Sequence, residues 1–162
     1  MGKWYNADGL IVKFGTTEAE PTFGGEYRTP TSTRIIEFEI NAADLEAFGT
    51  PTFLSDTVKL PNGVLLEAAE FVVLEAFTSA GAATLTFGLY DDDEATAYDA
   101  DGIDAAIALT AIDTVGEKVT CDGALVGTVL ANNTPSYVAA TVGAANYTAG
   151  KGVLRLHITY FA

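Results

Sequence analysis

The alternation of apolar and polar residues is most regular in the stretch from Leu60 to Tyr90. Between Thr84 and Tyr90 every second residue is large and apolar, which predicts a half-buried strand. Before it, Val64–Phe77 is an almost unbroken apolar run that mixes helix-forming and strand-forming residues. We interpret this run as a strand that is buried on most of both faces. The short connection Thr78–Gly81 consists of turn-forming residues, so the two runs are expected to form a hairpin.

The rest of the chain adds shorter apolar runs that are separated by Gly, Asp, Asn and Pro. Runs that predict further strands are Arg34–Ile40, Lys118–Cys121, Ala124–Leu130, Tyr137–Val142 and Leu154–Tyr160, and Thr57–Leu60 leads into the central hairpin. We expect a helical turn within Asn41–Phe48, a tight turn at Asp122-Gly123 and another turn at Gly150–Gly152. Many short strands with turn residues between them predict an all-β, single-domain β-sandwich, jelly-roll-like in topology, over residues 34–162.

Acidic residues are concentrated in Asp91–Glu94 and continue with Asp99, Asp101 and Asp104. Such oxygen-rich clusters can hold calcium, but the spacing does not fit an EF-hand loop, because alanines would occupy its first and last ligand positions. The preferred interpretation is one short helix that begins at Asp101, with Asp104 at its third position, and a solvated loop without metal. The inner stripe of this helix would be Ile103, Ala106, Ile107 and Thr110.

Residues 1–33 form a segment of different character, an irregular N-terminal arm with one short strand near Leu10–Phe14. The arm is rich in Thr, Glu, Gly and Pro, and it is either a surface loop or a segment that becomes ordered against another subunit. Both interpretations stay open; the second would explain four aromatic residues in an otherwise polar segment, since such side chains commonly anchor interfaces. The candidate interface residues are Trp4, Tyr5, Phe23 and Tyr27.

Charge and composition exclude several classes of function. The formal net charge is −14, from 22 acidic and eight basic residues, so a direct nucleic-acid partner is not expected, nor is docking on an anionic membrane. The one cysteine, Cys121, has no basic neighbour, and the one histidine, His157, lies within an expected strand without a nucleophile at an elbow. We therefore expect a packed cysteine, an exposed histidine on a sheet face, no catalytic residues, no cofactor and no metal.

Three segments together resemble tailed-phage structural proteins of the small capsid decoration, or cement, type. They are Asp8-Gly9-Leu10-Ile11-Val12-Lys13-Phe14-Gly15 with Gly24-Gly25; Leu60-Pro61-Asn62-Gly63-Val64 with Glu75-Ala76-Phe77 and Leu85-Thr86-Phe87-Gly88-Leu89; and Tyr147-Thr148-Ala149-Gly150-Lys151-Gly152 through Tyr160. The resemblance implies a virion protein with a jelly-roll-like sandwich that is often trimeric, lies on the phage head and bridges capsomers.

The leading hypothesis is thus a non-enzymatic decoration protein, made in the host cytoplasm and located on the capsid surface. Its expected partners are the major capsid protein and further copies of the same chain, in a homotrimer. The alternative is a tail- or fibre-associated module that binds host glycan, with calcium held by Asp91, Asp93, Asp99 and Asp101.

Overall fold

The computed structural model describes residues 33–55, 57–91, 93–131 and 134–160, together with the backbone of two short strands at 3–5 and 11–13. The chain divides into two units, Met1–Thr31 and Ser32–Ala162. In the first unit β1 (Lys3–Tyr5) pairs antiparallel with β2 (Ile11–Lys13). No helix in the described part of the chain is long and apolar enough to cross a membrane.

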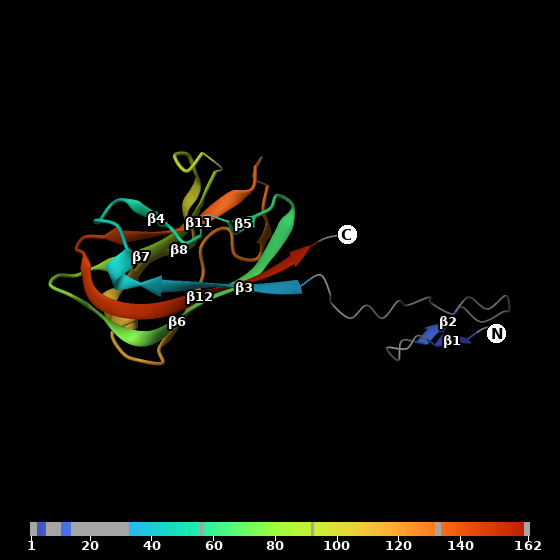
Figure 1. Cartoon of the computed structure of the whole chain (residues 1–162), viewed down its shortest axis with the longest axis horizontal. Helices are drawn as coiled ribbons and strands as arrows, with labels where there is room; N and C mark the ends of the chain where they lie inside the picture. Colours follow the sequence, from blue (N-terminus) through green and yellow to red (C-terminus); the bar gives the residue numbers. More distant parts are fainter. Residues whose placement is uncertain are drawn as a thin grey trace. The chain divides into compact units, whose positions relative to one another are not determined.

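The second unit is a sandwich of two antiparallel sheets (Figure 1). The first sheet has the order β10-β6-β12-β3 with β9 also on β6, and the second has the order β4-β11-β7-β8 with β5 also on β11. The strands of the first sheet are β3 (Thr33–Asn41), β6 (Val64–Ser79), β9 (Lys118–Cys121), β10 (Thr128–Val129) and β12 (Tyr147–Tyr160). Those of the second sheet are β4 (Pro51–Phe53), β5 (Lys59–Leu60), β7 (Thr84–Tyr90), β8 (Ala97–Ala108) and β11 (Ser136–Gly143).

The topology is that of a jelly roll. The short strands β4 and β5 lie along one edge of β11, and β9 and β10 lie along one edge of β6, so each pair acts as one interrupted strand. Counted this way there are eight strands in sequence, with sheet orders 1-8-3-6 and 2-7-4-5. Six of the seven connections then pass from one sheet to the other, and only β7 and β8 form a hairpin within one sheet. The predicted all-β, jelly-roll-like sandwich is confirmed.

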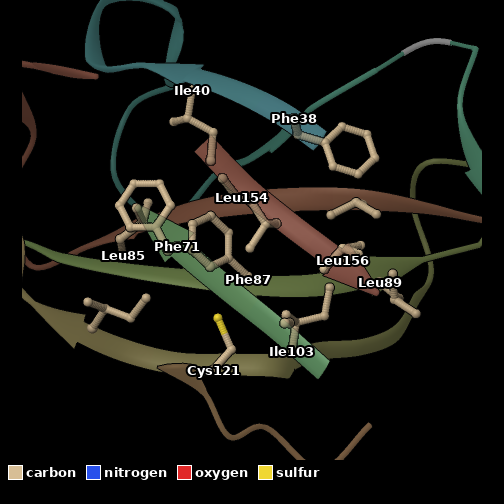
Figure 2. Packing of buried hydrophobic residues seen from close by; sticks show 14 of the residues in the cluster. Phe38, Ile40, Phe71, Leu85, Phe87, Leu89, Ile103, Cys121, Leu154 and Leu156 are labelled. Atoms are coloured by element: carbon tan, nitrogen blue, oxygen red, sulfur yellow. The ribbon is translucent and has the colours of Figure 1, made fainter. Parts of the chain in front are cut away.

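The core lies between the two sheets and is built from the alternating residues of each strand. Phe71 of β6, Phe87 of β7 and Leu154 of β12 are completely buried there, and the Phe71 and Phe87 ring centroids are 5.3 Å apart (Figure 2). The expected inner face of β7 is confirmed, since Leu85, Phe87 and Leu89 are buried. In β3 the residues Phe38 and Ile40 are buried, so alternation marks the inner face of both strands.

Strand β6 and its expected hairpin differ from the prediction. One face of β6 carries the buried residues, whereas Glu67, Leu74 and Glu75 on the other side are exposed. The turn after it does not form a hairpin with β7, because β6 pairs with β12 and β7 pairs with β11. The connection instead carries the chain from one sheet to the other, so that Phe77 and Leu85 enter the core from opposite layers.

The predicted short helix is wrong, because residues 97–108 form the strand β8. A pattern of capping residues describes only local contacts, and here the pairing of β8 with β7 prevails over it. The only helical turns in the described residues are 3₁₀ turns, η1 (Ala42–Asp44), within the expected helical turn, and η2 (Leu109–Ala111).

Two predicted turns are also wrong. Residues Ala124–Leu130 do not pair with β9 across Asp122-Gly123; instead β9 and β10 both pair with β6. The segment Gly150–Gly152 lies inside β12. Its glycines serve close packing, since a Cβ on Gly152 would lie 2.3 Å from the Phe71 ring and one on Gly150 2.5 Å from the Phe77 ring.

Candidate interaction surfaces

The candidate interface residues of the arm are described only in part. Trp4 and Tyr5 lie in β1, where their backbones are opposite Val12 and Ile11 of β2. Phe23 and Tyr27 lie outside the described residues. A role of these four aromatic residues in an interface stays a prediction.

The loop between β7 and β8 is organised by Asp93. Its carboxylate accepts hydrogen bonds from the backbone N–H of Thr96 (2.8 Å) and of Ala95 (3.0 Å), and from the Thr96 hydroxyl (2.8 Å). These hydrogen bonds lower the pKa of Asp93, and the one from the backbone N–H of Thr96 has the largest effect. Both carboxylate oxygens thus stabilise the turn itself, as an Asx turn does.

Asp99 and Asp101 interact with each other on β8. Burial raises the pKa of Asp99, and a hydrogen bond with Asp101 raises it further. Asp91 and Asp93 belong to the loop before this strand, and Asp92 lies outside the described residues. Within the described residues, no three His, Cys, Asp or Glu side chains are grouped so that they could hold a metal ion.

Asp104 and Cys121 form a buried pair between β8 and β9. Asp104 is 6% exposed and Cys121 is 2% exposed, and the thiol donates a hydrogen bond to the carboxylate. Burial raises the pKa of Asp104, with Asp122 acting in the same direction. Burial and the adjacent Asp104 carboxylate also raise the pKa of the Cys121 thiol, so it remains protonated and unreactive. The expectation of a packed cysteine is confirmed.

The outer face of the first sheet carries a row of linked charges. Arg155 in β12 donates from Nε to Glu37 of β3 (2.6 Å) and from Nη1 to Glu70 of β6 (3.4 Å). Glu70 also forms an ion pair with Lys118 of β9. The pKa of Glu70 is lowered, mainly by the hydrogen bond from Lys118. Burial acts in the opposite direction, and the positive charges of Lys118 and Arg155 lower the pKa further. The row thus connects four strands across the sheet.

His157 lies on the same outer face, partly exposed, as expected. Its register partners are Ile35 of β3 and Ala68 of β6, neither of which could supply a nucleophile. The side chain of Ile35 is 58% exposed at this edge of the sheet. These neighbours offer no partner for general acid–base chemistry.

The outer face of the second sheet carries an aromatic cluster of Phe53, Tyr90 and Tyr137. The Phe53 ring is 5.5 Å from that of Tyr90 at 87° and 5.8 Å from that of Tyr137 at 65°. The Lys59 ammonium lies 4.3 Å from the centre of the Tyr137 ring. Tyr90 and Tyr137 are only 9% and 7% exposed. A sugar-binding platform needs open ring faces, which these edge-to-face contacts do not leave.

Charge is distributed unevenly over the sandwich. Residues 60–117 contain no Lys or Arg, and 91–104 alone contain seven Asp or Glu. Of the five basic residues after position 33, Arg34, Lys118, Lys151 and Arg155 all lie in strands of the first sheet. A shallow hollow of about 160 Å³ beside β3 and β4 is smaller than typical ligand pockets.

No protein-family model matches the sequence, and no curated protein matches it by sequence. The fold, however, is shared with chains of three phage capsids. A chain in the capsid of Ralstonia phage GP4 matches with a TM-score of 0.60 and 18% identity, over 82% of this chain and 87% of that one. A chain in the cyanophage Pam1 capsid asymmetric unit matches with a TM-score of 0.56 and 14% identity, over 91% and 98%. A chain in the acidic stable capsid of Helicobacter pylori bacteriophage KHP30 matches with a TM-score of 0.53 and 17% identity, over 80% and 88%.

One surface that no pattern in the sequence predicted is the edge of β3, which has no strand partner on one side among the described residues. The alternation in Arg34–Ile40 predicted a strand but not its neighbour β12, which lies more than 100 positions further along the chain. The hydrogen bonds from Arg155 to Glu37 and Glu70 could not be predicted either, because these residues are far apart in sequence.

Proposed function

We propose that this chain is a non-enzymatic structural protein of a phage virion that decorates the outside of the head and stabilises it. The observation that carries the proposal is the jelly roll, which covers four fifths or more of chains from three phage capsids and of this chain. Jelly rolls serve many functions, so the fold acts here as support by analogy. The described surfaces agree with a binding role, because they offer interfaces rather than a reactive cleft.

The partners in this proposal are the major capsid protein and two further copies of the chain. A homotrimer would match a three-fold position on a capsid lattice, where one trimer can bridge adjacent capsomers. The arm supplies anchoring residues for these contacts, namely Trp4, Tyr5, Phe23 and Tyr27. Burial of several such side chains contributes several kcal/mol, at roughly 25 cal/mol per Å² less the cost of ordering the arm.

A glycan-binding role on a tail or fibre is less well supported. The aromatic cluster on the second sheet packs its rings against each other, so it offers no row of open ring faces. The calcium that this alternative requires would compete with the backbone for Asp93, whose oxygens already accept three hydrogen bonds. A shift in melting temperature with calcium would favour this alternative.

The test measures binding to phage heads that lack the protein. Deletion of residues 1–7 combined with Phe23→Ala and Tyr27→Ala should leave the melting temperature of the sandwich within a few degrees of wild type. The same variant should co-sediment poorly with heads. A control variant, Phe48→Ala, removes a 60% exposed aromatic side chain from the sandwich and should bind heads normally.

Two results would refute the proposal. Wild-type protein that does not co-sediment with heads at any concentration is not a decoration protein. An arm variant that melts far lower yet binds heads normally assigns the arm to the core of the protein instead of the interface.

A further inference from the structure

The edge of the first sheet at β3 is long and regular. Its ladder with β12 runs without a register shift from Thr33 opposite Thr159 to Asn41 opposite Lys151. On its other side β3 has no strand partner among the described residues. The strand contains neither Pro nor Gly, and it exposes Arg34, Ile35, Glu37 and Glu39. Such an edge presents a row of backbone groups that can pair with another chain.

The other three edges of the sandwich are interrupted. In the pairing of β7 with β8, Phe87 of β7 lies opposite Asp104 of β8, but Leu89 lies opposite Asp99. This change of register leaves a wide bulge in β8. That bulge is covered by the following segment, since Gly123 donates to the Ile103 carbonyl and Leu125 to that of Gly102. The edges at β4 with β5 and at β9 with β10 each consist of two short pieces. Sheet edges are commonly protected in these ways, so the regular edge of β3 is the exception that an assembly partner would cover.

The two strands of the arm need a further strand or a packing surface, which an unpaired sheet edge could provide. β1 and β2 have three residues each and pair only with one another among the described residues. A two-stranded ribbon of this length is not stable alone in water and needs a third strand or a packing surface. In its register the backbone of Lys3 lies opposite that of Lys13. A partner strand with acidic residues would suit two lysines at paired positions.

Charge favours the arm over a second sandwich as the partner of β3. Residues 1–31 contain three basic and four acidic residues, a net charge of −1. The remaining residues contain five basic and 18 acidic residues, a net charge of −13. Pairing of two β3 edges would bring two sandwiches of −13 together, whereas β1 and β2 each contain one lysine and β3 exposes two glutamates.

We propose that the free edge of β3 accepts a strand of the β1–β2 ribbon from a second copy of this chain. The inference rests on the proposed trimer, because a three-fold assembly requires a contact between two different surfaces of the subunit. The connecting residues 14–32 number 19 and can extend to about 60 Å, which is enough to reach a neighbouring subunit. Backbone hydrogen bonds would provide the pairing, and the lysines would contact the glutamates.

The experiment uses full-length protein, free and bound to heads, prepared as an equal mixture of ¹⁴N- and ¹⁵N-labelled copies. A zero-length carbodiimide joins a lysine amine to a carboxylate only where the two are in contact. We expect cross-links from Lys3 or Lys13 to Glu37 or Glu39, and about half of them should combine the two isotopes. Hydrogen exchange should show β3 amides that become at least tenfold less protected when residues 1–13 are deleted.

Matched substitutions test the surface. Ile35→Lys adds a cation beside the glutamates of β3 and should weaken self-association at least tenfold. Leu74→Lys makes a similar change at a 49% exposed position in the middle of the sheet and should leave self-association unchanged. Cross-links that never combine isotopes would show that the arm binds its own sandwich, and a deletion variant that still forms trimers with protected β3 amides would equally overturn the proposal. Failure of the wild-type protein to bind heads would refute the decoration role, whereas the cross-links test the edge independently.

Discussion

Tyr147 carries a buried hydroxyl that has no hydrogen-bond partner among the described residues. The residue is 8% exposed, and its ring packs edge-on against Phe77, 5.2 Å away. Burial raises the pKa of Tyr147 to about 12. Leaving a polar group buried without a partner costs about 1–3 kcal/mol relative to water. Tyr147→Phe removes that cost and keeps the ring, so we expect the free energy of unfolding to rise by about 1 kcal/mol.

The measurement is urea unfolding at pH 7, with circular dichroism and tyrosine fluorescence as two probes. The midpoint should rise while the slope against urea stays constant, since the surface exposed on unfolding is unchanged. For a chain of this size a gain of 1 kcal/mol corresponds to about 2–4 °C in melting temperature.

Tyr98→Phe provides the matched control for the same chemical change. The Tyr98 hydroxyl accepts a hydrogen bond from the backbone N–H of Ala131 (3.3 Å), so its removal should lower stability by about 0.5–1 kcal/mol. If Tyr147→Phe is less stable than wild type, the hydroxyl has a partner, such as a bound water, and the reasoning is wrong.

Three further predictions concern the backbone and pH. Ala106 has a φ of 53°, so Ala106→Gly should raise the free energy of unfolding by about 1 kcal/mol in urea, while Ala105→Gly lowers it; equal effects would contradict the strain. A Cβ on Gly88 would lie 2.1 Å from the Ala100 carbonyl oxygen, so Gly88→Ala should lower the melting temperature by about 5 °C or more, and an unchanged value would disprove the close approach. Burial raises the folded-state pKa of Asp104, so its ionisation destabilises the fold as pH rises above the ordinary value of 3.8. Asp104→Asn should therefore gain stability relative to wild type between pH 4 and 7, and a difference that does not vary with pH would refute this sign.

The alternation of apolar and polar residues predicted those strands that have one buried and one exposed face along their whole length. In β12 the alternation of Leu154, Leu156 and Ile158 follows the two-layer geometry, so the inner face could be recognised without any partner. The charge balance likewise argues against a nucleic-acid partner without structural knowledge, and this stays a prediction. What could not be predicted is which strands pair, because the partners of β12 begin at Thr33 and Val64.

The wrong predictions share one physical cause. Asp101 and Asp104 resemble the start of a helix, but the bulge at Gly102 and the pairing with β7 hold them in a strand. Residues Thr78–Gly81 have hairpin composition, yet a connection between layers has the same need for small and polar residues. Local sequence cannot distinguish these cases, because the deciding contacts come from elsewhere in the chain. The proposed use of the β3 edge rests on such distant contacts as well.

The position of β12 has a consequence for the order in which the protein can fold during synthesis. This strand lies between β3 and β6, yet it is the last of the three to leave the ribosome. A nascent chain that ends at Gly143 therefore holds the two flanking strands of a sheet without the strand that joins them. The closure of long loops must come before these contacts form, which makes folding slow and places its decisive step after β12 has emerged. Chains interrupted before β12 would keep β6 with β9 and β10 but leave β3 unpaired, so only molecules that contain this strand would present the complete first sheet for assembly.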